Sequence, residues 1–229
     1  MKEEAAISPT GVRSIFVRDY VLSFLALFGF LAAYLALTPT LPLYLARLQS
    51  DAREIGILVG TIGISALAAR FIVGRALLRY SERVLMMSGA LLFTVSFLVL
   101  IAFRPFWPFF FARLLQGIAF ASLDTAAVAY VVRIIPPAQR ARAISYFLLA
   151  PSVASAIAAS SGVFVFNTYG FTVLLLACVG VCLCVFLLSS RLKQDRAGAI
   201  GISTTEKRRF FEPKILAPAA QSFADLCLT

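Results

Sequence analysis

Residues 84–103 read VLMMSGALLFTVSFLVLIAF and contain neither a charged side chain nor a proline. A helix of this length rises about 30 Å, which matches the hydrocarbon core of a bilayer. The composition fits the same environment: 61% of the 229 residues are hydrophobic and 14% are charged, against roughly 45–50% and 25% in soluble domains. The segment therefore predicts a membrane-spanning helix.

Five further apolar runs flank this span, at 20–45, 55–77, 106–132, 143–166 and 171–190. Each is long enough to cross the bilayer as a helix. Pro39 and Pro42 close the first run, where they are expected to end or kink the helix near one surface. The sequence predicts an all-α membrane protein with six transmembrane helices, arranged as two triplets in a 3+3 inverted-repeat bundle.

The basic residues are concentrated in alternate loops. Of the 21 lysines and arginines, sixteen lie in the N-terminal tail, in the turns after the second and fourth runs, and after the sixth run, whereas the other loops hold three. Cytoplasmic loops of membrane proteins are enriched in basic residues. Both ends of the six-helix unit are therefore expected to be cytoplasmic, in the plasma membrane. This topology accounts for the net charge of +10, so no nucleic-acid partner is expected.

The chain has no histidine, which excludes a serine–histidine protease and histidine metal ligands. An intramembrane aspartyl protease needs paired acids, and only Asp124 lies deep within a span. The four cysteines have no neighbouring ligands for a metal. We expect no enzyme activity, no metal and no cofactor, and the expected partners are the lipid bilayer and a small-molecule substrate.

The chain divides into four segments by composition. These are a cytoplasmic tail at 1–19, the six-helix bundle at 20–190, a basic cytoplasmic linker at 191–212 and an apolar segment at 213–229. The last segment is too short to cross a core of about 30 Å as a helix. We expect it to be the start of a seventh helix at which the chain is truncated.

Arg113, Gln116 and Asp124 place polar groups at membrane depth within 106–132. Eleven residues separate Arg113 from Asp124, so the two lie on one helix face, roughly 16 Å apart, with Gly117 between them. Three interpretations are open. The face lines a substrate or proton path, or its charges orient neighbouring helices, or Asp124 extends to the cytoplasmic surface. Tyr34 is a further candidate for the path, although a simple helix contact is the favoured explanation.

Two patterns of small residues are typical of closely packed membrane helices. One lies along 143–166 and consists of Ala150, Ala154, Ala158 and Gly162. It either packs within the bundle or forms a rocking interface with a second bundle. The other pattern, Gly56 and Gly60, is expected to pack within the bundle.

The turn after the second run is strongly basic. Its candidate gate residues are Gly74, Arg75, Arg79 and Arg83. The arginines would lie on one face if the helix continued past the membrane surface. They either form a latch at the cytoplasmic mouth or simply anchor the loop on the cytoplasmic side.

Several segments, in the right order, resemble the major facilitator superfamily of transporters. The segment GRALLRYSER at 74–83 resembles the signature G-x-L-(small)-D-R-(aromatic)-G-R-R that follows the family's second helix. ARLLQGIAFA at 112–121 resembles its R-x-x-Q-G signature, and FFEPKILAPA at 210–219 resembles the lead-in to its seventh helix. The resemblance implies the N-terminal half of a secondary transporter that exports a small molecule by alternating access. It implies that Arg113 and Asp124 line the path and that 74–83 lies at the inner gate.

Several positions depart from the family pattern. Leu78 replaces the acidic residue of the first signature, and Arg133 stands where many members carry an acid that pairs with the loop arginines. Ala158 and Ala159 replace the Gly-Pro of an antiporter signature. These departures argue against proton-driven drug antiport. The alternative is a truncated, non-transporting remnant, or a half-transporter that needs a C-terminal six-helix half or a second copy.

Overall fold

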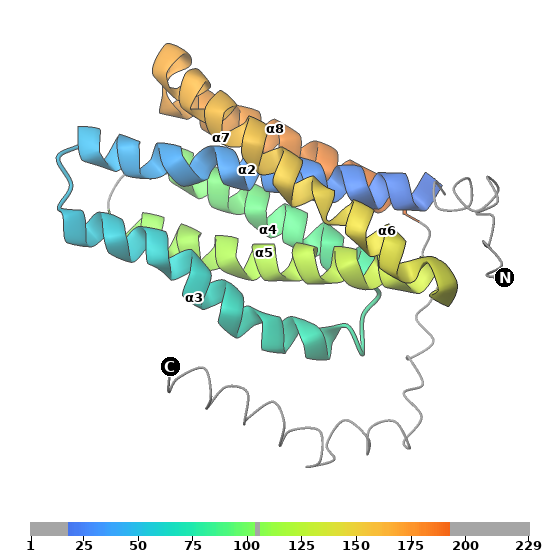
Figure 1. Ribbon diagram of the computed structural model, residues 1–229. Coiled ribbons are helices and arrows are strands. Elements are labelled where there is room, and N and C mark those ends of the chain that lie inside the picture. Colours follow the sequence, from blue (N-terminus) through green and yellow to red (C-terminus); the bar gives the residue numbers. More distant parts are fainter. Residues whose placement is uncertain (1–17, 104–105, 193–229) are drawn as a thin grey trace, which may run out of the picture. The chain divides into compact units, whose positions relative to one another are not determined.

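The computed structural model describes residues 18–103 and 106–192, and these form the six predicted membrane helices (Figure 1). Their bounds are α2 Arg18–Arg47, α3 Ala52–Ala76, α4 Glu82–Ala102, α5 Phe106–Ile134, α7 Leu149–Tyr169 and α8 Phe171–Ser190. A short turn η1, Pro137–Gln139, and the helix α6, Arg140–Phe147, lead into α7. The described part contains no strand, so the prediction of an all-α membrane protein is confirmed.

Most of the predicted tail and linker, and all of the predicted seventh helix at 213–229, lie outside the described residues. The division of the chain at 19, 190 and 212 therefore stays a prediction.

The first helix continues through both of its prolines, so of the two expected effects they do not end the helix, and a kink stays a prediction. Pro39 and Pro42 lie inside α2, which ends at Arg47. Each proline removes one backbone N–H donor from the helix. A hydroxyl group adds a further bond beside the prolines, since Thr40 Oγ1 donates to the Ala36 carbonyl at 2.9 Å. Side-chain bonds of this kind allow proline in membrane helices.

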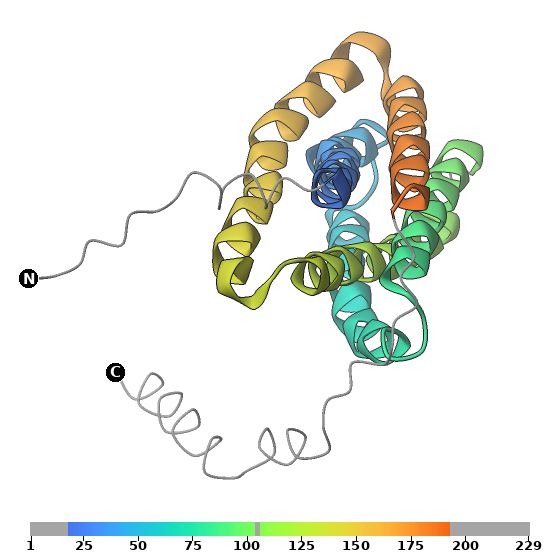
Figure 2. The same ribbon diagram turned by 90° about the vertical axis from the view of Figure 1, so that its right-hand side faces the viewer.

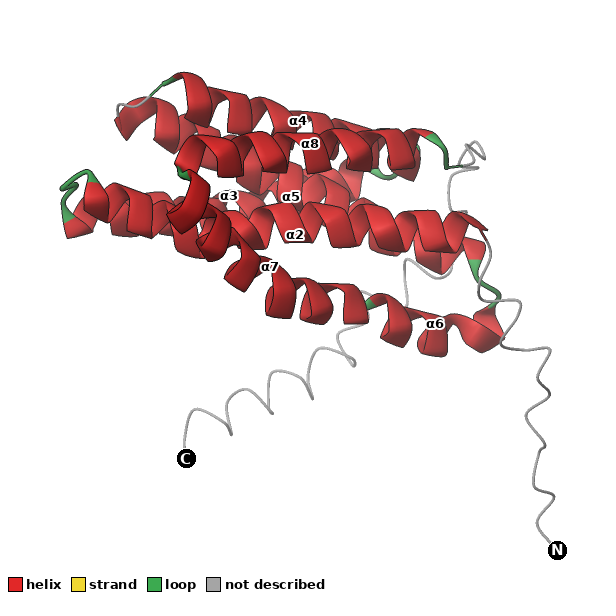
Figure 3. Ribbon diagram, turned by 90° about the horizontal axis from the view of Figure 1, so that it is seen from above, coloured by secondary structure: helices red, strands yellow, loops and turns green. Residues whose placement is uncertain are grey.

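The membrane helices form two triplets, one of α2, α3 and α4 and the other of α5, α7 and α8. The first helix of each triplet packs against helices of the other triplet. The first helix of the second triplet, α5, packs against α3 and α4, and the first helix of the first triplet, α2, packs against α7 and α8. Figure 2 shows α2 and α5 near the centre of the bundle, and Figure 3 shows α4 and α8 on one side of α2 and α7 on the other. Because three spans precede it, the second triplet enters the membrane from the opposite side. This is the geometry of an inverted repeat.

Two glycines allow the closest of these helix contacts. A Cβ on Gly117 of α5 would overlap the Ser65 hydroxyl and lie 2.7 Å from the Ile62 carbonyl oxygen of α3. A Cβ on Gly162 of α7 would lie 2.7 Å from the Ala36 carbonyl oxygen of α2. Both contacts join the first helix of one triplet to the second helix of the other. Backbones this close require a residue without a side chain.

Candidate functional site

Three charged side chains lie at membrane depth in the described helices: Arg70 of α3, and Arg113 and Asp124 of α5. Arg113 is buried, with 2% of its surface exposed. Its Nη1 donates to Oε1 of Gln116 at 2.9 Å, one helical turn further along α5. Arg113 Nε and Gln116 Nε2 are buried without a hydrogen-bond partner.

Asp124 pairs with a neighbouring helix and not with Arg113. Arg70 Nη2 of α3 donates to Asp124 Oδ2 at 3.2 Å, with 52% of the arginine side chain and 27% of the aspartate side chain exposed. The pair borders an open recess of about 450 Å³, which Thr125, Val128 and Ala129 also line. The two charges that share a stripe of α5 therefore belong to two separate polar groups.

Arg70 is the functional candidate that the sequence did not single out. It lies six residues before the end of α3, and Asp124 lies ten residues before the end of α5. These offsets place the two residues about 9 and 15 Å from the same end of the bundle. The sequence does show a cation and an acid at similar depths on two helices, and this could have suggested the ion pair. Whether the two side chains meet depends on how the helices cross.

Tyr34 of α2 is half-buried in an aromatic cluster. Its ring centroid lies 5.1 Å from that of Phe120 on α5 and 6.5 Å from that of Phe93 on α4. Phe120 lies seven residues after Arg113 and four after Gln116, so all three share one face of α5. The structure thus places Tyr34 on the side of α5 that carries Arg113 and Gln116.

The four residues of the predicted gate do not share one helix face. Helix α3 ends at Ala76, so Gly74 and Arg75 lie in its last turn, Arg79 lies in the following turn and Arg83 lies in α4. The helix does not continue past Ala76, so the arginines lack the shared helix face that a continuous helix would have given them. Arg83 Nη2 donates to the Ser190 carbonyl oxygen at the end of α8, which ties the start of α4 to the last span.

An ion pair that the sequence did not reveal lies beside this turn. Arg133 Nε of α5 lies 3.2 Å from Glu82 Oε1 at the start of α4. Arg133, which stands where the family resemblance led us to expect an acid, therefore still joins α5 to α4 through an ion pair.

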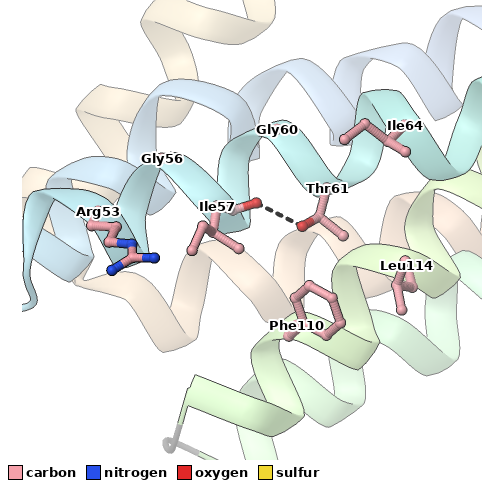
Figure 4. Close-up of a pocket in the computed structure, with 8 residues that line it drawn as sticks. All are labelled: Arg53, Gly56, Ile57, Gly60, Thr61, Ile64, Phe110 and Leu114. Carbon is pink, nitrogen blue, oxygen red and sulfur yellow. Dashed lines mark hydrogen bonds between the residues drawn. The ribbon is translucent and has the colours of Figure 1, made fainter.

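The α3–α5 contact leaves an apolar groove on one flank. A cavity of about 550 Å³ lies between Gly56, Gly60 and Ile64 of α3 and Phe110 and Leu114 of α5, with Arg53 at one end (Figure 4). A second cavity, of about 460 Å³, also includes Ile64 and Leu114 and continues the groove along α3.

Gly56 and Gly60 face this open groove. A Cβ on either glycine would have no atom within 4 Å. The expectation that they pack within the bundle is therefore wrong. Helix α3 turns them away from the contact that Ser65 makes with Gly117, because five and nine residues separate Gly60 and Gly56 from Ser65.

The small residues of α7 lie on its buried side. Ala150, Ala154 and Ala158 are almost fully buried, and Gly162 meets the backbone of α2. Ser152 and Ser155 of the same helix are exposed. The structure thus places the small-residue stripe against the bundle and leaves the polar face of α7 open.

Among the described residues, no group of three or more acidic, cysteine or histidine side chains lies close enough to hold a metal ion. Cys178 and Cys182 are buried on one face of α8, and Cys178 contacts the Ala33 carbonyl oxygen of α2. Their surroundings are those of packed hydrophobic residues.

The chain matches the family model of the Major Facilitator Superfamily over residues 22–224. It is 28% identical over 127 residues to "Multidrug resistance protein 2" of Bacillus subtilis (strain 168), a match over 56% of this chain and 32% of that protein. Its fold is similar to that of a D-xylose-proton symporter, with a TM-score of 0.60, 18% identity, and coverage of 87% of this chain and 52% of the symporter.

The fold is also similar to that of a peptide transporter, POT (E310Q mutant), in complex with alafosfalin. The TM-score is 0.63 at 15% identity, and the match covers 99% of this chain and 48% of the transporter. The chain thus spans about a third of the curated relative and about half of each solved transporter. With a family model that covers most of its length and a bundle of six apolar helices, this integral multi-pass membrane protein belongs to the Major Facilitator Superfamily.

Proposed function

We propose that the chain supplies one six-helix bundle of a secondary transporter that exports a small organic molecule by alternating access. The observation that carries this proposal is the Arg70–Asp124 pair, which is partly exposed on a membrane-spanning face. Charged side chains at membrane depth are costly against lipid, at about 2.5–3.5 kcal/mol each on insertion scales. A pair exposed to this degree therefore faces a polar path.

Arg70 and Asp124 line the recess, and neither of them lines the apolar groove. Arg70 is two residues from both Ala68 and Ile72, which line the groove, so its side chain projects roughly 160–200° away from theirs. The groove is suited to lipid or a packed helix, and the recess beside Asp124 is suited to water and substrate. In this proposal, Arg113, Gln116 and Tyr34 lie deeper along the same path.

The proposal requires a second wall for the path. A transporter of this architecture moves its substrate between two bundles that rock against each other. We propose that a second six-helix unit, or a second copy of this one, supplies that wall. Efflux is favoured over uptake by the similarity to a multidrug resistance protein.

The orientation belongs to the same proposal. Arg79 lies in the turn after α3, and Arg140 and Arg142 lie in α6 just beyond the turn after α5, whereas Arg47 and Arg53 flank the described loop between α2 and α3. The positive-inside rule then places the end of the bundle with the turns at 77–81 and 135–139, here called the basic end, on the cytoplasmic side of the plasma membrane. The gate residues 74–83 lie there.

The test is substrate efflux from vesicles that contain the protein, alone and with a co-expressed second bundle. We expect Asp124→Asn to insert normally and to reduce transport at least tenfold, because it removes the charge that faces the path. The matched control is Glu54→Gln, an exposed carboxylate in the first turn of α3. Full transport by Asp124→Asn would contradict the assigned path. No transport in any combination of bundles would favour a non-transporting remnant.

A further inference from the structure

Arg113 carries a buried charge without a counter-charge in the described helices. Its surface is 2% exposed, and it donates a hydrogen bond to the neutral amide of Gln116. The ion pairs of the described residues join other side chains, namely Arg70 to Asp124 and Arg133 to Glu82. A buried charge that lacks a partner costs several kcal/mol even after the protein relaxes. The site is therefore incomplete as it stands.

Neighbouring acids are too far away to complete it. Asp124, on the same helix, is about 16 Å further along the axis and is held by Arg70. Helices α2 and α4 both pack against α5. Residues 20–46 and 84–102 of these two helices include no acidic or basic side chain. Glu54 of α3, which also packs against α5, is exposed in the first turn of that helix and forms no ion pair with Arg113. No acid of the described bundle therefore pairs with Arg113.

The unused polar atoms of the pair are all donors. Arginine cannot accept a hydrogen bond, so Gln116 presents its oxygen to Arg113 and keeps its NH₂ group free. Arg113 Nε and Gln116 Nε2 are the two atoms left without a partner. A cluster that offers N–H donors and a positive charge, but no acceptor, is suited to a ligand that only accepts hydrogen bonds. Carboxylates and halides are such ligands.

Aromatic side chains line the same face of α5. Phe120 shares that face with Arg113 and Gln116, and its ring lies 5.1 Å from that of Tyr34. Both rings are half-buried, so the face approaches the surface at these two residues. An apolar surround strengthens the attraction between a cation and an anion, because the local dielectric constant is low. It also favours an anion with an apolar body.

We propose that Arg113 and Gln116 form a binding site for a small monovalent anion inside the bundle, and that a substrate carboxylate is the anion it takes during transport. The guanidinium supplies the charge and the Nε donor, the Gln116 amide supplies a second donor, and Tyr34 and Phe120 contact the apolar part of the ligand. The assignment of a substrate carboxylate to this site rests on the proposed function, since it names the substrate class for that path.

The experiment measures the melting temperature of the purified full chain in lipid nanodiscs. Chloride and benzoate are titrated separately, with gluconate keeping the ionic strength constant because it is too large and polar for this face. We expect a saturable rise in melting temperature with benzoate, because a ligand that binds only the folded state stabilises it. Arg113→Met should remove the rise, and Gln116→Leu should weaken the apparent affinity about tenfold, the cost of one charge-assisted hydrogen bond.

The matched control is Arg53→Met, which removes an exposed arginine at the end of the apolar groove and should leave the benzoate response intact. A melting temperature that does not depend on the anion would overturn the site, as would an unchanged response in Gln116→Leu. The latter variant keeps the test decisive if Arg113→Met fails to fold. A response to chloride without one to benzoate would keep the anion site and overturn the substrate class. Benzoate binding without transport would leave the site standing and count against the proposed function.

Discussion

The two ends of the bundle are held by two arginines in equivalent positions. Helix α2, the first of its triplet, ends at Arg47. Its Nη2 donates to Asn167 Oδ1 near the end of α7 at 2.7 Å, and its guanidinium lies 4.4 Å from the centre of the Phe166 ring. This contact, the Arg47 clamp, fixes the turn between α7 and α8.

Helix α5, the first of the other triplet, has Arg133 one residue before its end. This arginine pairs with Glu82 at the start of α4, and its guanidinium lies 5.2 Å from the centre of the Tyr130 ring. The contact, the Arg133 clamp, fixes the turn between α3 and α4. The first helix of each triplet thus clamps the turn between the second and third helices of the other, once at each membrane surface.

The clamps differ in chemistry and in burial. The Arg133 clamp is an ion pair with 8% of the Glu82 side chain and 26% of the Arg133 side chain exposed. The Arg47 clamp joins a charge to a neutral amide, and both Arg47 and Asn167 are exposed. A buried ion pair is costly to break because it leaves an uncompensated charge, whereas an exposed bond competes with water. Removal of one member of the pair should therefore cost more at the basic end than at the other end.

The largest effect is expected from Arg133→Leu. This change leaves the Glu82 carboxylate buried, and Glu82 Oε2 already lacks a hydrogen-bond partner. Loss of one member of a buried pair costs about 3 kcal/mol, so the unfolding free energy in detergent should fall by about that amount. The control is Arg142→Leu at the basic end, an exposed arginine, which should change it by less than about 0.5 kcal/mol. Equal losses in the two variants would contradict the clamp.

Reversing the polarity of the ion pair gives the second test. Glu82→Arg and Arg133→Glu should each destabilise the bundle, because each places like charges where the native pair lies 3.2 Å apart. The double variant should recover most of the loss, with a coupling energy of about 1–3 kcal/mol in a double-mutant cycle. Additive losses would mean that the two side chains do not interact in the folded protein.

The spans could be predicted from the sequence, but the pairing of their charged residues could not. A run such as 84–103 has to be a helix, because a bilayer leaves no other way to satisfy its backbone. Arg133 looked like the loss of a charged contact because its partner, Glu82, is distant along the chain. Which face of a helix meets which neighbour depends on rotation and tilt, and hydropathy does not encode them. Gly56 and Gly60 show the same limit, since their spacing did not reveal that they face outward.

A smaller effect is expected at the other end from Arg47→Leu. The change removes one hydrogen bond and one cation–π contact, both partly exposed. Together these are worth about 1 kcal/mol, so the unfolding free energy should fall by roughly a third of the loss in Arg133→Leu. Hydrogen exchange at the α7–α8 turn should rise in the same variant and stay unchanged at the α3–α4 turn. A rise at both turns would show that the clamps are not independent.

The smallest effect is expected from Asn167→Asp, which turns the Arg47 clamp into an ion pair like its counterpart. The aspartate would meet Arg47 at the same 2.7 Å, but both side chains are exposed, so the gain should be at most about 0.5 kcal/mol and should disappear at high salt. The salt dependence of the unfolding free energy measures this gain in stability, and Thr168→Asp, one residue away, is the control. If burial and not charge makes the basic end stronger, the modified clamp will remain weaker than the Arg133 clamp. A gain near 3 kcal/mol would instead show that the charge alone separates the two ends.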